Sequence, residues 1–199
     1  MSMPTFRKAI EFANDTEEGS LVLSGGEPTL HPKFMDMVGY TLCHFEFQEF
    51  KLLIVTNGTN KDVSLRLANM TEIGILDAVL SYDDFHDTSM VSMEVFHAFD
   101  RLRARGHEGI REINIPYKQG RAADPARGIA GAREGCACTG WNVNTNGNIS
   151  PCGCEDAPIL GNVRDGGVPF IHEEFCPCEC CHDQEEEVLQ VLFPEEERV

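Results

Sequence analysis

Thiol groups are the chemically most suggestive side chains in this sequence of 199 residues. Nine cysteines are present, and all but Cys43 fall between positions 136 and 181. In a reducing compartment, crowding of this kind indicates a metal centre more often than disulfides. The alternative, a secreted disulfide-linked module, is disfavoured because the opening residues do not read as an export signal. The candidate metal ligands are Cys136, Cys138, Cys152, Cys154, Cys176, Cys178, Cys180 and Cys181.

A second group of candidate residues follows a short apolar run at positions 21–24. Gly25 and Gly26 allow the backbone to turn sharply and to expose its N–H groups. Glu27 then offers a carboxylate, and Pro28 fixes the direction in which the chain leaves the turn. This combination predicts a sharp, well-defined turn that could hold a small ligand.

Two further apolar runs end in polar residues. Thr56 and Asn57 close the run that begins at position 51, and Ser81 closes the next one, with Asp83 two positions later. Taken alone, Asn-Gly is an ordinary turn and Ser-x-Asp could be a helix cap. The interest of these residues is that all of them follow predicted strands.

The spacing of apolar residues predicts an α/β fold. Strands that alternate with helices pair in parallel through right-handed crossovers, which gives an open sheet or an incomplete (β/α) barrel of about four strands. Binding groups gather at the carboxyl ends of such strands. We expect helices near 4–14, 32–47, 63–73 and 89–105 and strands near 21–24, 51–56, 76–81 and 110–115.

The glycine-glutamate turn and the two polar strand ends together resemble the radical S-adenosylmethionine (radical SAM) superfamily. They occur in that family's order, separated by one helix and one strand. The resemblance implies a partial (β/α) barrel that binds S-adenosylmethionine. It assigns the Glu27 turn to the amino group of the methionine moiety, and Ser81 and Asp83 to the ribose. The implied cofactor-binding residues are Gly25, Gly26, Glu27, Pro28, Thr56, Asn57, Ser81 and Asp83.

The cysteine-rich segment resembles the SPASM and twitch extensions of that family, which bind auxiliary 4Fe-4S clusters. Cys136, Cys152 and a Cys-Pro-x-x-Cys unit at position 176 carry this resemblance, although a full SPASM pattern has more cysteines after that unit. Residues 141–149 predict a hairpin with Asn146 and Gly147 at its tip, which would bring Cys138 and Cys152 together. We therefore expect one metal site.

The identity of the metal stays open. Four of these thiolates could form a zinc tetrahedron. An iron–sulfur cluster is favoured because the strand-end motifs point to radical SAM proteins. Of the histidines, His86 is a site candidate, His31 is expected to be a loop or packing residue, and His172 and His182 flank the cysteines. Cys43 is expected to be a small buried hydrophobic residue.

Catalytic radical SAM proteins carry a Cys-x-x-x-Cys-x-x-Cys loop after a first strand, and this sequence starts at the helix that follows such a loop. We expect the chain as given to bind S-adenosylmethionine weakly and not to cleave it reductively. Two function classes follow. One is a truncated radical SAM-type enzyme that modifies a peptide or small molecule, and the other is a non-catalytic metal-binding scaffold for a peptide or protein partner.

The expected lack of a first strand also leaves residues 21–24 at an exposed sheet edge, where self-association or a partner chain would cover unpaired backbone groups. A formal net charge of −17 argues against nucleic acid and anionic membranes as partners. We expect a cytoplasmic protein without membrane spans. The expected organisation is a partial barrel at 1–118, a cysteine-rich module at 119–183 and an acidic tail or short amphipathic helix at 184–199.

Overall fold

A computed structural model describes residues 1–16, 19–45, 51–83, 86–112, 140–151 and 157–166, together with the backbone of 189–192. Helices and strands alternate up to residue 111, as the sequence predicts. The elements of this part are α1 (Met3–Asp15), β1 (Ser20–Ser24), η1 (Pro28–Leu30), α2 (Phe34–His44), β2 (Lys51–Thr56), α3 (Lys61–Glu72), β3 (Asp77–Ser81), η2 (Thr88–Met90), α4 (Met93–Ala104) and β4 (Ile110–Arg111).

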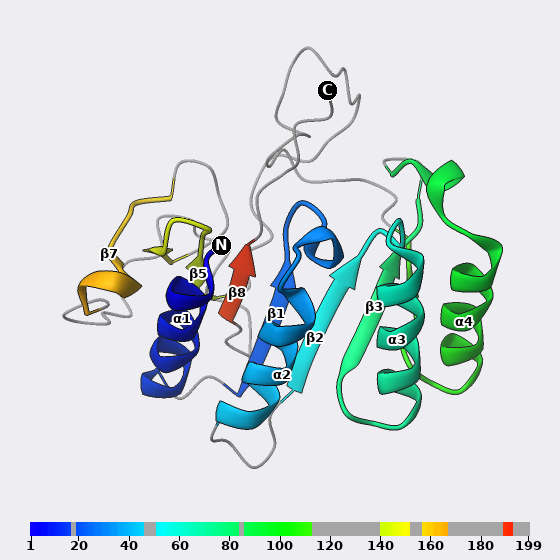
Figure 1. Cartoon of the computed structure of the whole chain (residues 1–199), viewed down its shortest axis with the longest axis horizontal. Coiled ribbons are helices and arrows are strands. Elements are labelled where there is room, and N and C mark those ends of the chain that lie inside the picture. Colours follow the sequence, from blue (N-terminus) through cyan, green and yellow to red (C-terminus); the bar gives the residue numbers. More distant parts are fainter. Residues whose placement is uncertain are drawn as a thin grey trace.

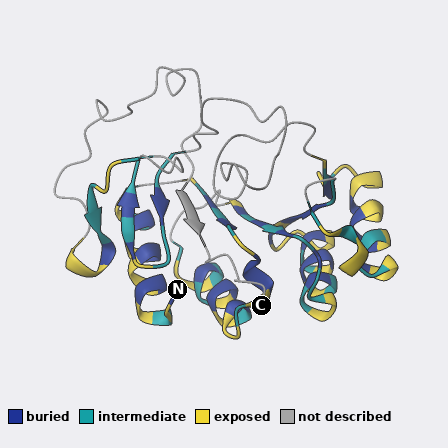
Figure 2. Cartoon of the chain, turned by 90° about the horizontal axis from the view of Figure 1, so that it is seen from above, coloured by how far each residue is buried: buried dark blue, intermediate teal, exposed yellow. Residues whose placement is uncertain are grey.

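The first four strands form a parallel sheet in the order β4-β3-β2-β1. Each new strand is added on the same side of the previous one, so the chain winds in one direction. The four α-helices accordingly lie on one face of the sheet (Figures 1 and 2). An α/β fold with four parallel strands, as predicted from the alternating pattern, is confirmed.

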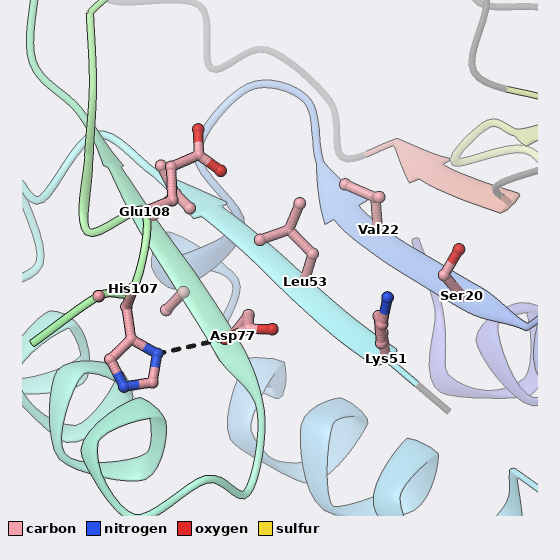
Figure 3. A pocket seen from close by; sticks show the side chains of 10 residues that line it. Ser20, Val22, Lys51, Leu53, Asp77, His107 and Glu108 are labelled. Carbon is pink, nitrogen blue, oxygen red and sulfur yellow. Dashed lines mark ion pairs between the residues drawn. The ribbon is translucent and has the colours of Figure 1, made fainter. Parts of the chain in front are cut away.

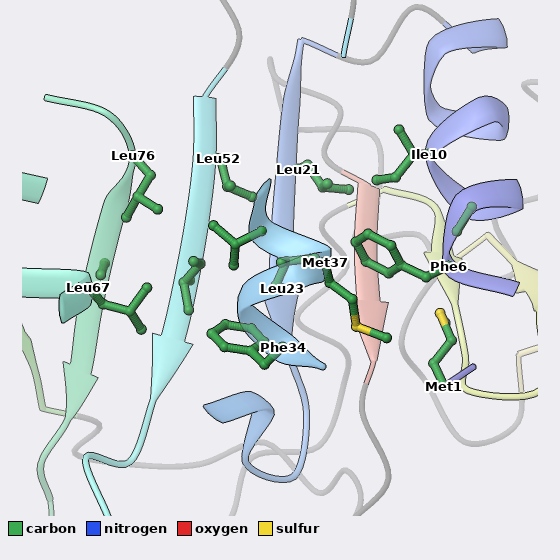
Figure 4. Close-up of a cluster of buried hydrophobic side chains, with 14 of the residues drawn as sticks. Met1, Phe6, Ile10, Leu21, Leu23, Phe34, Met37, Leu52, Leu67 and Leu76 are labelled. Atoms are coloured by element: carbon green, nitrogen blue, oxygen red, sulfur yellow. The ribbon is translucent and has the colours of Figure 1, made fainter. Parts of the chain in front are cut away.

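The core lies between this sheet and its helices (Figure 4). Side chains alternate along a strand, so Leu21 and Leu23 point to the helical face, where both are fully buried. Phe34 and Met37 of α2 are at most 1% exposed and pack in the same cluster. Val22 points to the opposite face and is half-buried.

Side-chain caps fix where three of the helices begin. Ser2 accepts a hydrogen bond from the Thr5 amide at α1, and Asn60 and Ser92 play the same part at α3 and α4. Such caps satisfy backbone N–H groups that have no partner inside the helix. They also set the lengths of the loops that leave β2 and β3.

Beyond residue 139 the described chain forms the hairpin that the Asn-Gly sequence predicted. β5 (Asn142–Val143) and β6 (Asn148–Ser150) pair in antiparallel fashion, and Gly147 in the turn has a φ of 82°. β7 (Gly161–Asn162) pairs with β6, and η5 (Val163–Asp165) follows.

This hairpin unit packs on α1. The Arg164 Nε group donates a hydrogen bond of 3.0 Å to Thr5 Oγ1. Trp141 meets the edge of Phe12 with ring centroids 6.2 Å apart. The predicted boundary near residue 118 lies outside the described residues, but β5 and β6 belong to the same sheet as β1–β4.

The prediction for the segment near residue 190 was wrong. Instead of an amphipathic helix or a solvated tail, β8 (Leu189–Leu192) is a strand that pairs in parallel with β1 on one side and β5 on the other. A short apolar run fits either a helix or a strand, and its own pattern does not decide between them. The unpaired edge of β1 decides it here, since β8 supplies the missing hydrogen-bond partners.

Two further predictions from the sequence concern Cys43 and membrane-spanning helices. Cys43, expected to be buried, is exposed near the end of α2, because the buried face of that helix falls on Phe34, Met37, Val38 and Thr41. In the described part of the chain, no helix combines the length and apolar character needed to cross a bilayer.

Candidate functional site

The turn after β1 is built on two glycines in left-handed backbone conformations. Gly25 has a φ of 84° and Gly26 a φ of 37°, values that a side chain would disfavour. Gly25 is half-buried and Gly26 is exposed. The turn therefore presents backbone, and no side chain, at the carboxyl end of β1.

The Glu27 carboxylate points into the protein and is 7% exposed. Its Oε1 atom accepts hydrogen bonds from the Thr29 amide at 3.1 Å, from Thr29 Oγ1 at 2.6 Å and from Thr56 Oγ1 at 2.7 Å. Its Oε2 atom accepts from the Asn57 amide at 2.5 Å. Three of these bonds fall on Oε1 and one on Oε2, so Glu27 ties the β1 turn to the end of β2.

The loop after β2 is held by its own polar side chains. Thr56 Oγ1 also accepts from the Gly58 amide at 3.1 Å, and Asn57 Oδ1 accepts from the Thr59 amide at 3.0 Å. Asn60 Nδ2 donates to the Thr29 carbonyl at 2.7 Å, which closes a second link to the β1 turn. The two loops form one hydrogen-bonded unit at the edge of the sheet.

The end of β3 lies beside this unit. The strand register pairs Thr56 with Leu80, so Ser81 sits at the level of the loop that begins at Asn57. Ser81 is buried, with 4% of its surface exposed. Two residues later, the Asp83 carboxylate meets His86 Nδ1 at 2.7 Å. The Asp83 side chain is 4% exposed and the His86 side chain 35% exposed.

The structure places the cofactor-binding candidates at the same carboxyl edge of three neighbouring strands. Direct hydrogen bonds join Glu27, Thr56 and Asn57. Ser81 and Asp83 follow the adjacent strand, while the glycines and Pro28 form the β1 turn. The eight cysteine candidates, and also His172 and His182, lie outside the described residues. Within the described ranges, no group of three or more potential metal-binding side chains occurs.

A separate pocket of about 380 Å³ opens at the opposite, amino ends of β1–β3 (Figure 3). Its floor is apolar, with Val22, Leu53 and Val79 on the sheet face that points away from the helices. Half-buried His107 and exposed Asp77 line its rim, with Nδ1 and Oδ1 3.7 Å apart. Sequence reasoning did not predict this pocket, since none of the strand-end motifs contributes to it.

His31 follows the β1 turn, as a loop residue. Its Nδ1 atom accepts a hydrogen bond of 3.2 Å from the Lys33 amide. Burial lowers the pKa of His31 from its ordinary value, and the positive amino terminus lowers it further, although a hydrogen bond to the Met1 backbone acts the other way. The neutral ring is the form that can accept from Lys33.

Sequence reasoning missed the contributions of Thr29 and Asn60. Thr29 supplies two of the four donors to Glu27, and Asn60 both caps α3 and holds the Thr29 carbonyl. A cap signal was present at Asn60, which precedes an apolar helical pattern. The link to Thr29 spans 31 positions and leaves no local sequence signal.

Comparisons with known proteins support the fold. No family model and no curated protein matches the chain. Among solved structures, the crystal structure of BtrN in complex with AdoMet and 2-DOIA superposes with a TM-score of 0.55 at 17% sequence identity, over 83% of this chain and 66% of BtrN. A selenomethionine form of BtrN in an open conformation gives a TM-score of 0.48 at 18% identity, over 83% and 64%.

This chain thus spans just under two thirds of the length of those BtrN chains. At such identity the likeness concerns the fold alone. The described α/β architecture is similar to that of BtrN.

Proposed function

We propose that this chain is a radical SAM-type protein that binds S-adenosylmethionine at the carboxyl edge of an incomplete (β/α) barrel. The observation that carries the proposal is the β1 turn, in which Glu27 is fixed by four hydrogen bonds while Gly26 remains exposed. A turn so firmly held, in a fold similar to that of BtrN in complex with AdoMet, fits a preorganised ligand cradle.

In this proposal the ligand contact falls on the backbone of the turn. The Glu27 carboxylate is already engaged inside the protein, so it is not the group that meets a ligand. Peptide groups at Gly25 and Gly26 are accessible, and carbonyl oxygens accept hydrogen bonds from an ammonium group such as that of the methionine moiety. The role of Glu27 is to hold the turn in place.

Isothermal titration calorimetry with S-adenosylmethionine tests this proposal. We expect measurable, weak binding to the purified chain, and loss of that heat in Gly26→Val, because a β-branched side chain would fill the exposed turn. Gly39→Ala on the exposed face of α2 is the matched control and should bind like the parent. An absence of binding at millimolar ligand would contradict the proposal.

We further propose that the eight C-terminal cysteines hold a metal centre, with an auxiliary 4Fe-4S cluster favoured over zinc. The donor set suits either group, since both are bound by thiolates. The second candidate function is a non-catalytic scaffold for a peptide or protein partner, and a cysteine triad encoded upstream in the same reading frame would favour the enzyme instead. Absorption spectroscopy and metal analysis after anaerobic reconstitution separate iron from zinc.

Reductive cleavage tests whether the chain as given is catalytic. We expect the reconstituted chain, given dithionite and S-adenosylmethionine, to form no 5′-deoxyadenosine above a control without protein. Formation of 5′-deoxyadenosine would favour the enzyme and would show that other thiolates assemble a competent cluster.

A further inference from the structure

Asp83 and His86 form a side-chain pair that takes no part in the ligand contact proposed above. The Asp83 carboxylate is almost fully buried, and it lies 2.7 Å from Nδ1 of His86. A carboxylate is an acceptor only, so Nδ1 must carry the hydrogen of this bond. The neutral imidazole then has its free electron pair on Nε2.

The Nε2 atom is directed away from Asp83, on a ring that is 35% exposed. Within the described part of the chain, no hydrogen-bond partner of Nε2 is present. Carboxylate–imidazole pairs of this kind fix the tautomer and orientation of a histidine. The arrangement therefore presents a proton acceptor to the outside.

His86 also forms two hydrogen bonds through its backbone. The His86 amide donates to the Asp83 carbonyl at 3.2 Å, and the His86 carbonyl accepts from the Thr88 amide at 2.9 Å. Tyr82, just before the pair, packs on Phe96 of α4 with ring centroids 4.9 Å apart. These contacts give the imidazole a defined position on the connection from β3 to α4.

That connection lies beside the proposed ligand site at both of its ends. It starts at Ser81, next to the loop that follows Thr56. At its other end Val91 lies against Gly58, where an added Cβ atom would come within 3.3 Å of Val91 Cγ1. His86 therefore belongs to the same carboxyl edge as the Glu27 turn.

We propose that His86 accepts, through Nε2, a proton from a hydroxyl or ammonium group of a ligand bound at this edge, and that Asp83 is its positioning residue. In this step the ligand O–H or N–H bond gives its proton to Nε2, its electron pair stays on the ligand atom, and the imidazolium is paired with the Asp83 carboxylate. The ligand part of this inference rests on the proposed function.

The tautomer of His86 tests the pair without any ligand. Nitrogen-15 NMR of the histidine side chains should show neutral His86 with its hydrogen on Nδ1. In Asp83→Asn the amide can donate to Nδ1, and the hydrogen should move to Nε2. A parent His86 with its hydrogen on Nε2 would overturn the inference.

The role of His86 in ligand binding is tested with S-adenosylmethionine as the probe. Its addition should shift the Nε2 resonance of His86, and His86→Phe should bind it about threefold to tenfold more weakly, the loss expected for one hydrogen bond. His86→Gln, which keeps an acceptor oxygen, should recover part of that loss, and exposed His97→Gln on α4 is the control.

These measurements separate the role of His86 from the proposed binding of S-adenosylmethionine. Binding of S-adenosylmethionine that leaves the His86 resonance and the His86→Phe affinity unchanged would overturn the role of His86 and leave the ligand site intact. An absence of binding would count against the proposed function, and the tautomer measurement would then decide the Asp83–His86 pair.

Discussion

Glu27 joins the turn after β1 to the loop after β2 through its hydrogen bonds. In Glu27→Gln the amide nitrogen cannot accept the hydrogen bond from the Asn57 amide, so a half-buried donor loses its partner. We expect the free energy of unfolding to fall by about 1–3 kcal/mol, as measured by urea denaturation.

Glu72→Gln is the matched control, because Glu72 forms an exposed ion pair with Arg105. Surface pairs of this kind contribute about 0–1 kcal/mol, so its effect should be clearly smaller. Equal effects of the two substitutions would mean that the Glu27 hydrogen bonds contribute no more than a surface pair.

His31 makes stability depend on pH in a defined direction. Burial lowers its pKa in the folded protein, so the unfolded chain binds this proton more tightly. The contribution is fully present above the ordinary histidine pKa of about 6.5 and is lost as the pH falls below it. The urea midpoint of the parent should drop between neutral pH and about pH 5, and the drop should be smaller in His31→Gln.

The same comparison with His97→Gln, on an exposed turn of α4, provides the control. Its midpoint should follow the parent. An identical acid drop in the parent and in His31→Gln would show that His31 does not cause it.

The residue types at the site could be predicted from the sequence, but the directions in which their side chains point could not. Glycines, Glu27 and Asn57 stood out because of their positions after apolar runs. Glu27 was nevertheless interpreted as presenting its carboxylate. Its inward direction depends on Thr56 and Asn57, which lie about 30 positions away and reach it only after β1 and β2 have paired.

At the scale of elements, Gly109 controls how β4 follows α4. It has a φ of 63°, and an added Cβ atom would lie 2.5 Å from the Phe99 carbonyl oxygen and 2.8 Å from the Arg103 nitrogen. Both contacts are with backbone, which cannot move aside easily. Gly109→Ala should lower the free energy of unfolding by more than about 1 kcal/mol in urea denaturation.

Gly39 provides the opposite case on α2. Nothing lies within 4 Å of a Cβ atom added there, and the residue is helical and exposed. Gly39→Ala should therefore raise stability by about 0.5–1 kcal/mol. The two substitutions add the same methyl group, so equal effects would contradict the explanation from backbone geometry.

Elements with a strong local signal were predictable. The strands at β1, β2 and β3 follow runs of apolar residues, and the hairpin of β5 and β6 follows its Asn-Gly turn. β8 was not predictable, since its four residues have no turn signal and their pairing depends on an edge formed far away in the sequence. The sequence predicted an unpaired edge at β1. We expected self-association or a partner chain to cover it, whereas a later strand of the same chain does so.

For the whole molecule, β8 links the parallel sheet to the hairpin. Val191 is aligned with Leu23 of β1 and with Val143 of β5. Val191→Pro removes one backbone N–H from a central strand and should loosen both pairings. We expect faster amide hydrogen exchange in β1 and a tendency to self-associate in light scattering, since the β1 edge would be exposed.

Val191→Ala separates backbone from side-chain effects, because it shortens the side chain and keeps the N–H group. Exchange in β1 should then stay closer to that of the parent. If the proline variant exchanged as slowly as the parent at residues 21–24, the β8 pairing would not be what protects β1.

The cysteine-rich segment gives a prediction at the same scale. Cys152→Ser and Cys176→Ser should each lower the bound metal per chain, whereas Cys43→Ser should not, since Cys43 is an exposed residue of α2 remote in sequence from the cluster. Metal analysis after reconstitution measures this. Metal-free parent protein with four disulfides would contradict it.

The position of β8 also sets an order of events during synthesis. Leu21 pairs with Leu189, so β1 emerges from the ribosome long before the strand that completes its hydrogen bonding. Throughout that interval the nascent chain carries an open apolar strand edge, a known route to misassembly. The sheet can close only by a contact between distant parts of the sequence, which is a slow step. Production of this protein should accordingly benefit from chaperones that shield strand edges.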